Sequence, residues 1–328
     1  MKRISLLLPR LGAVALTITF AAASVAQEST YPARPIKLVV PYAAGGFPDT
    51  VSRMVGQRAG EVLGQPFVIE NRPGAGGLAA CELVARAAPD GYTLLAMDNG
   101  HWGINPALYP KLPYDPLRDF APVSLMGMTP MFLFVHASVP ATSLQELIAL
   151  GKSKPNQMNY GSSGIGSIHH LAMEMVKSVT GLEVVHIPYK GSGQSVPALM
   201  GGQTSLMVAS LPSLTAHVKA GNVRILAVIA GKRVSQAPGV PTFPEQGVPA
   251  LDFLTHVGVV APAGTPASVV ARLNAGIARA LENPDLVQKL AGVGVEPAPG
   301  SPESFAAQMQ EEMKKYATAV RVSGAKVN

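Results

Sequence analysis

Short apolar runs alternate with amphipathic segments along most of the chain. Apolar runs at 36–40, 66–70 and 92–97 predict buried strands, and helical spacing of apolar positions predicts helices at 49–63 and 78–88. Strands that alternate with helices of this length are typical of a parallel sheet whose faces are covered by helices. The first hundred residues therefore predict an α/β fold.

The same pattern returns further along the chain. An apolar run at 131–136 predicts a strand, and the helix expected after it covers 143–150. A strand, a Gly/Ser turn and a helix follow, with Ser167 as the predicted N-cap and Gly181 as the predicted C-terminal stop. The second half thus repeats the arrangement of the first.

We predict two α/β lobes, each a sheet flanked by helices, joined by crossing hinge strands without a low-complexity linker. The last part of the chain reads as a strand and two helices, at 253–262, 266–282 and 302–321. We expect it to return to the first lobe. The predicted boundaries are 27–125 together with 253–328 for lobe 1, and 126–252 for lobe 2.

The first 26 residues have the pattern of a secretory signal peptide. Lys2 and Arg3 form a charged start, and an apolar stretch follows. Arg10 interrupts the roughly 20 apolar residues that a retained membrane span needs. We therefore expect cleavage near Ala26 and export to a periplasm.

Composition narrows the class of protein. Of 328 residues 48% are hydrophobic and 14% charged, which supplies a core and argues against disorder. The net charge of +6 includes three positive charges of the signal segment, and no run interleaves Lys and Arg with aromatic residues, so we expect no nucleic-acid partner. Cys81 is the only cysteine, which excludes an internal disulfide, and its spacing predicts a buried side chain.

Two glycine-containing turns stand between a predicted strand and a helix. The first covers residues 42–47 and the second residues 162–167. Such turns direct unpaired backbone N–H groups at one point, which favours binding of an anion. We interpret Asp49 as the N-cap of the first helix. Because ligands of open α/β sheets bind beyond the carboxyl ends of strands, the two turns suggest a hinged clamp around a cleft.

A dinucleotide-binding enzyme is an alternative. Gly74, Gly76 and Ala79 form a G-x-G-x-x-A pattern between a strand and a helix, and Asp98 closes the next strand. Residues 71–73, however, stand where that fingerprint requires an immediate tight turn, and an exported chain meets no nicotinamide pool.

Other chemistries lack a complete pattern. Gly161 and Ser163 begin the G-x-S-x-G signature of serine hydrolases, but Ile165 replaces its last glycine. His170 and Glu174 share a helix face, yet a zinc site requires three or four ligands. We predict no catalytic residue, no metal and no cofactor.

Nine stretches in order carry a family resemblance over essentially the whole chain after residue 31. They are YPARPIKLVVPYAAGGFPDTVSR, VIENRPGAGG, AAPDGYTLL, INPALYPKLPYDPLRDFAPVS, MNYGSSGIGSIHHLAME, VHIPYKGSG, GGQ, PGVPTFPEQGVP and GVVAPAGTP. The chain resembles the Bug-type solute receptors, the extracytoplasmic binding components of tripartite tricarboxylate transporters.

The resemblance implies a two-lobed, type II-like periplasmic binding protein that closes on a small carboxylate and delivers it to a membrane permease. It also implies that backbone amides and ordered water hold the carboxylate. We expect a monomer that binds an organic acid or amino acid without converting it; a receptor that feeds a signalling sensor is a further alternative. The expected ligand-binding residues are Tyr42, Ala43, Ala44, Gly45, Gly46, Phe47, Asp98, Asn99, His101, Ser162, Ser163, Gly164, Gly166, Ser167, Gly191 and Ser210.

Asp98 carries a hypothesis about the ligand. A carboxylate at a strand end would repel a polyanion, since two like charges 4 Å apart cost about 4 kcal/mol at an effective dielectric constant of about 20. Asp98 would then select an acid with an additional donor or positive group, and Trp102 could add an aromatic wall. Alternatively, Asp98 caps a local turn with Asn99 and Gly100.

Overall fold

The structure is a computed structural model that describes residues 31–327. The expected signal peptide, residues 1–26, lies outside the described residues. Among those that are described, none of the helices has both the length and the apolar character that a bilayer crossing requires.

Lobe 1 begins with three parallel strands joined by helices. Strand β1 lies between β2 and β3 and pairs in parallel with both. The strand–helix alternation predicted for this part is confirmed. The elements are β1 (Ile36–Val40), α1 (Phe47–Leu63), β2 (Phe67–Asn71), η1 (Ala75–Gly77), α2 (Leu78–Ala85) and β3 (Thr93–Asp98). Cys81 of α2 is fully buried, as its spacing predicted.

Lobe 2 repeats this arrangement. Strand β5 pairs in parallel with β6 and β7, and α5 has the predicted boundaries, with Ser167 as N-cap and Gly181 as C-cap. The helices of this lobe are α4 (Leu144–Ser153), α5 (Ile168–Thr180), α6 (Ser192–Met200), η3 (Leu211–Ser213), α7 (Thr215–Lys219) and η4 (Pro244–Gln246). Its strands are β5 (Asn159–Ser162), β6 (Val185–Pro188), β7 (Leu206–Ser210) and β8 (Val223–Val228).

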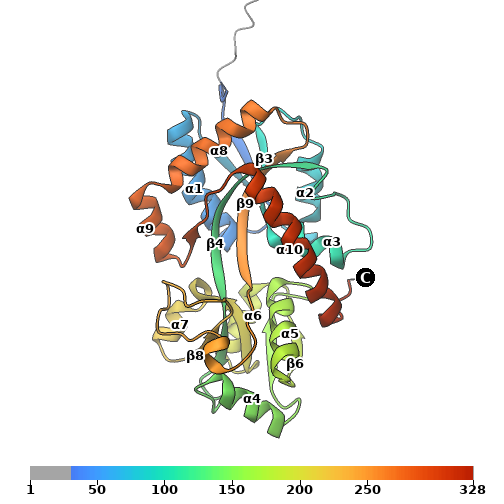
Figure 1. Cartoon of the computed structure of the whole chain (residues 1–328), viewed down its shortest axis with the longest axis vertical. Helices are drawn as coiled ribbons and strands as arrows, with labels where there is room; N and C mark the ends of the chain where they lie inside the picture. The colour runs from blue at the N-terminus through green and yellow to red at the C-terminus, as the bar shows by residue number, and fades with distance from the viewer. Residues whose placement is uncertain (1–30, 328) are drawn as a thin grey trace, which may run out of the picture. The chain divides into compact units, whose positions relative to one another are not determined.

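Two long strands connect the lobes. The first half of β4 (Phe120–His136) pairs with β9 (Leu254–Pro262), and its second half pairs with β7 and β8. In Figure 1, β4 and β9 run side by side from one group of helices toward the other. The described strands therefore form one continuous sheet, in which β4 belongs to both lobes.

The C-terminal helices pack against elements of both lobes. Helix α8 packs on α1 and β4, whereas α10 contacts α5 of lobe 2 as well as η2 and α3 of lobe 1 (Figure 1). Leu108, Leu171 and Tyr316 belong to one buried apolar cluster, so the lobes share a core on this side. These elements are η2 (Gly100–Ile104), α3 (Asn105–Leu108), α8 (Ala267–Leu281), α9 (Pro284–Gly292), β10 (Glu296–Pro297) and α10 (Pro302–Ser323).

Candidate ligand-binding site

The carboxyl ends of the strands in the two lobes face each other along β4. In lobe 1, Asp98 at the end of β3 lies level with Val257, which pairs with Gly127 of β4. In lobe 2, Ser210 at the end of β7 pairs with Met131 of β4. Gly127 and Met131 are four residue steps apart along β4, or about 13 Å at about 3.3 Å per residue. Because β3 and β7 point toward each other, the turns that follow the parallel strands of both lobes lie on facing edges.

The first turn is fixed by a buried carboxylate. Helix α1 begins at Phe47 with Gly46 as N-cap, so the prediction that Asp49 is the N-cap was wrong. Asp49 lies within the first turn of the helix because the two residues before it already have helical geometry, and its Oδ2 accepts a hydrogen bond of 2.8 Å from the N–H of Gly45. Arg53 forms an ion pair with the same carboxylate at 2.9 Å. Burial raises the pKa of Asp49, but hydrogen bonds from Arg53, Gly45 and Asn71 outweigh it and hold the pKa below its usual value.

The backbone of this turn is open on its outer side. Ala43, Ala44, Gly45 and Gly46 are exposed, and an added Cβ at Gly45 would meet no atom within 4 Å. Gly45 has φ 91°, in the left-handed region that favours glycine. The main chain of the turn at Gly45 is therefore accessible from outside the protein.

Asp98 is buried at the end of β3, with 6% of its surface exposed. Its Oδ2 accepts a hydrogen bond from the Tyr42 hydroxyl at 2.7 Å, and its Oδ1 lies 2.6 Å from Nδ1 of His101. Oδ1 also accepts from the N–H groups of Gly100 and His101. Burial raises the pKa of Asp98, but the contacts with His101 and Tyr42 outweigh it and hold the pKa below its usual value. These are the contacts of a local turn; the role of Asp98 in selecting a ligand stays a prediction.

Two neighbours of Asp98 face the interior. Asn99 is 1% exposed and donates from Nδ2 to the Leu254 carbonyl at 2.7 Å and to the Tyr316 hydroxyl at 2.6 Å. Trp102 is fully buried and donates from Nε1 to Glu312 at 2.7 Å. Trp102 therefore packs in the core, and the aromatic wall proposed from the sequence was wrong.

The second turn is held by imidazoles. The hydroxyl of Ser162 lies 2.6 Å from Nε2 of His186, and that of Ser163 lies 2.6 Å from Nδ1 of His169. The N–H of Gly166 donates to Nδ1 of His170 at 3.1 Å. Burial lowers the pKa of both His169 and His186 to about 4 and lowers that of His170, so all three rings are neutral at pH 7.

The remaining predicted residues also lie on the lobe 2 edge. Gly164 has φ 124°, and Ser167 caps α5 by accepting from the N–H of His170 at 3.3 Å. Gly191 is the N-cap of α6, with φ 138°, and Ser210 ends β7 with its hydroxyl 3.3 Å from that of Ser213. Loops after β5, β6 and β7 therefore meet at one edge, as parallel strands require.

Sequence reasoning missed Asn71 and His186. The Nδ2 group of Asn71 donates to the Tyr42 carbonyl at 3.0 Å and to Asp49 at 2.8 Å, which ties the end of β2 to the first turn. Its position at a strand end is the signal that could have revealed it. His186 pairs with Tyr160 of the neighbouring strand, so only the strand register brings it to Ser162.

The structure lends no support to the dinucleotide fingerprint. Its glycines follow β2, which is an edge strand of the sheet, and the carboxylate expected to bind a ribose is that of Asp98, turned toward Tyr42 and His101. Within residues 31–327 no group of three His, Cys, Asp or Glu side chains is placed to hold a metal.

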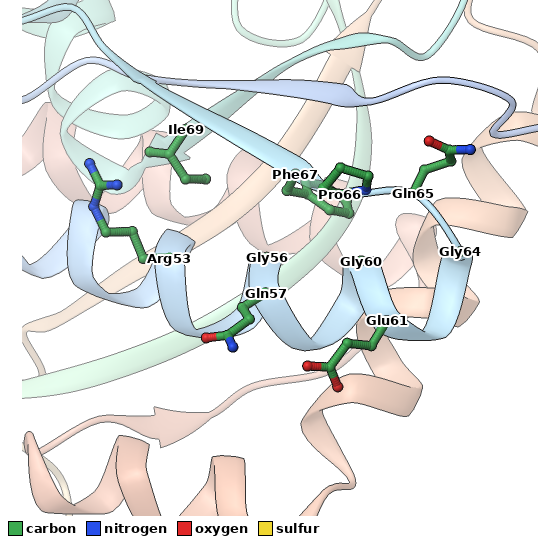
Figure 2. Close-up of a pocket in the computed structure, with 10 residues that line it drawn as sticks. All are labelled: Arg53, Gly56, Gln57, Gly60, Glu61, Gly64, Gln65, Pro66, Phe67 and Ile69. Atoms are coloured by element: carbon green, nitrogen blue, oxygen red, sulfur yellow. The ribbon is translucent and has the colours of Figure 1, made fainter.

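An open groove of about 620 Å³ runs between α1 and β2 (Figure 2). Gly56, Gly60 and Phe67 line it, and it reaches Pro66 at the amino end of β2. The groove therefore lies along the outer edge of lobe 1, and none of the predicted site residues lines it.

Two lobes that share crossing strands and present their strand ends to each other define a two-lobed periplasmic binding protein. The chain belongs to the family described as tripartite tricarboxylate transporter family receptor, whose model matches residues 51–324. The resemblance read from the sequence motifs is thereby confirmed.

Relatives cover nearly the whole chain. Protein BugT from Bordetella pertussis (strain Tohama I) is 35% identical over 306 residues, which cover 93% of this chain and 94% of BugT. Rpa4515 of R. palustris, solved with adipate, is 36% identical with a TM-score of 0.84 and covers 90% of this chain and 100% of its own. MatC (Rpa3494) from Rhodopseudomonas palustris, solved with malate, is 34% identical with a TM-score of 0.79. The match covers 88% of this chain and 100% of the MatC chain.

Proposed function

We propose that this protein binds a small organic carboxylate between the facing strand ends of its two lobes and releases it unchanged. The observation that carries the proposal is the pair of opposed glycine-containing turns, 42–47 and 162–167, each at the start of a helix. Helix N-termini attract anions through their unpaired N–H groups and the helix dipole.

Charge at the site favours a carboxylate held mainly by backbone and hydroxyl groups. Two carboxylates border the first turn: Asp49 pairs with Arg53 and accepts from Gly45, and Asp98 accepts from the Tyr42 hydroxyl. Around the second turn the three imidazoles are neutral. An incoming anion therefore meets dipoles rather than a full positive charge, which keeps binding reversible.

The ligands of solved relatives support a dicarboxylate. Rpa4515 was solved with adipate and MatC with malate, both small dicarboxylates. We propose the same class for this chain. Export to a periplasm and delivery to a membrane permease complete the proposal, since the family is that of transporter receptors.

A ligand panel tests the proposal. Purified protein is mixed with adipate, malate, citrate, glutamate and nicotinate, and thermal unfolding is followed together with product formation. A ligand at 100 times its Kd should add about 2.7 kcal/mol to the free energy of unfolding. Conversion of a panel member to product would contradict the receptor function, and a shift with NAD or NADP alone would favour an enzyme instead.

The same panel tests the selecting role of Asp98. Asp98→Asn should change the ranking of the five acids if the carboxylate faces the ligand. An unchanged ranking, or citrate as the tightest ligand of the wild type, would show that Asp98 does not select the ligand and only holds its local turn.

A further inference from the structure

Three histidines from two elements each contact a different residue of the second turn. His169 and His170 come from the first turn of α5, and His186 comes from β6. Ser162, Ser163 and Gly166 are the residues they hold. Of the three contacts, the one made by His170 differs in kind.

His170 acts as an acceptor. Its Nδ1 receives the N–H of Gly166, and a backbone amide can only donate, so Nδ1 carries a lone pair and the ring is neutral. A hydroxyl, in contrast, can reverse its bond to a charged imidazole. Ser162 and Ser163 therefore keep a partner when His186 or His169 gains a proton, whereas Gly166 loses its acceptor and faces a second donor.

The His170 ring is buried and stacked against a second imidazole. It is 5% exposed and stacks on His186 at 4.1 Å between ring centroids, with 9° between the planes. His186 in turn stacks on Tyr160 at 4.7 Å. A ring that cannot rotate away transmits its protonation state to Gly166.

The charged and titratable groups that face the stack are few. Glu174 and Lys177 of α5 form an ion pair at 2.8 Å, and Glu174 accepts from the Tyr160 hydroxyl at 2.5 Å. Glu174 favours a charged His170 and Lys177 opposes it, while burial is the largest influence and favours the neutral ring. In the buried apolar cluster that contains Tyr160, α3 contributes Leu108 and α10 contributes Ala319 and the phenol Tyr316.

Gly166 has little freedom to adjust. Its φ of 75° lies in the left-handed region, and a Cβ there would overlap the Leu108 side chain of lobe 1. The residue thus sits against the other lobe as well as at the start of α5. A change at its N–H must alter the shape of the turn.

We propose that His170 is a positioning residue for ligand binding: its neutral ring holds the N–H of Gly166 and sets the binding shape of residues 162–167, and its protonation releases the turn and the bound carboxylate. This inference rests on the proposed function. By linkage, a bound ligand must in turn make His170 harder to protonate.

Two variants of His170 distinguish its role as a hydrogen-bond acceptor from the effect of its protonation. In His170→Asn the amide oxygen can replace Nδ1 as the acceptor but does not titrate, and in His170→Leu the acceptor is lost. His136→Asn is the matched control, since His136 ends β4 at the far end of lobe 2 and bonds to Ser138. Thermal unfolding of each variant confirms that it folds.

The first measurement needs no ligand. In ¹⁵N-labelled wild type, the amide signal of Gly166 should move as the pH falls from about 7.5 to 4. The movement should be absent in His170→Asn and unchanged in His136→Asn. A Gly166 signal that stays fixed in the wild type, or that moves equally in His170→Asn, would overturn the inference even if binding is confirmed.

The second measurement uses adipate and malate as probes. His170→Leu should bind about tenfold more weakly at neutral pH, as expected for one hydrogen bond of about 1.4 kcal/mol. The wild type should lose at least about tenfold more affinity than His170→Asn between about pH 7.5 and 4. Probe protonation affects all variants equally and cancels in this comparison. Identical pH profiles would overturn the inference; if neither probe binds the wild type, the proposed function fails while the Gly166 signal still decides the role of His170.

Discussion

In each of the two turns a side chain accepts a hydrogen bond from a glycine N–H, but the accepting groups differ in charge. In lobe 1 the backbone N–H of Gly45 is held by the ionised carboxylate of Asp49. In lobe 2 the backbone N–H of Gly166 is held by the neutral imidazole of His170. Both turns follow a parallel strand and start a helix, so the difference lies in the side chain that closes the turn.

That difference assigns each turn its own response to acid. A carboxylate accepts hydrogen bonds down to its pKa, which is about 3.9 unperturbed and lower for Asp49. An imidazole accepts only while it is neutral, and its unperturbed pKa is about 6.5. Falling pH should therefore disturb the turn of lobe 2 before that of lobe 1.

The largest effect on stability is expected from Gly166→Ala. A non-glycine residue at φ 75° costs about 1–2 kcal/mol, and overlap with Leu108 adds about 1–3 kcal/mol. Urea unfolding should show a loss of about 2–5 kcal/mol. Gly193→Ala is the control, because a Cβ there meets no atom within 4 Å. Equal losses in both variants would mean that the turn is not held against Leu108.

Asp49→Asn should have the next largest effect. The substitution removes the charge that Arg53, Gly45 and Asn71 share, and loss of such buried contacts costs about 1–3 kcal/mol. Glu61→Gln on the same helix is the control, since its exposed pair with Arg58 should contribute about 0.5 kcal/mol or less. A smaller loss of unfolding free energy for Asp49→Asn than for the control would show that the carboxylate does not stabilise the turn.

The pH dependence of stability sharpens the comparison. The pKa of His169 and of His186 is lowered to about 4 in the folded chain, so their contribution is complete above about pH 6.5 and is lost as the pH falls toward 4. The pKa values of Asp49 and Asp98 are also lowered, so their contribution is lost at still lower pH. Urea midpoints across this range should show His186→Asn reducing the loss of stability between about pH 6.5 and 4, and Asp49→Asn reducing the loss at lower pH. The reverse assignment would contradict the comparison.

Gly46→Val should change stability least, by about 1 kcal/mol or less. Gly46 has φ −77°, which any residue adopts, and the nearest atom to an added Cβ is the Ala43 carbonyl oxygen at 3.9 Å. The exposed side chain should nevertheless block a ligand from the first turn. Calorimetry with adipate or malate should show no binding while unfolding stays cooperative. Wild-type affinity in Gly46→Val would mean that the ligand does not bind at this turn.

Much of the fold could be predicted because its signals are local. Apolar runs marked β1 and β3, and Ser167 and Gly181 marked the ends of α5. The alternation of strands and helices then required parallel pairing. Helix η2 escaped notice because Gly100, Trp102 and the other residues there follow a π-helical geometry rather than the usual period, and α3 because its four residues are too few to show a period.

The contacts inside the site could be predicted only in part. Position at strand ends was enough to select Tyr42, Asp98 and Ser162. The pairing of Gly45 with Asp49 depends on where α1 begins, and a Pro48 at the start of the helix shifted that point by two residues. The stack of His186 on His170 depends on strand register and helix orientation together, which no spacing in the sequence encodes.

One titration tests the central claim, that a small carboxylate lies between the two turns. Adipate, and separately malate, is added to ¹⁵N-labelled protein at neutral pH while the backbone amide signals are followed. We predict that the largest changes fall in residues 42–47 and 162–167 together, with little change along Gly56, Gly60 and Phe67 of the groove in Figure 2. Changes centred on that groove, or confined to one of the two turns, would contradict the account.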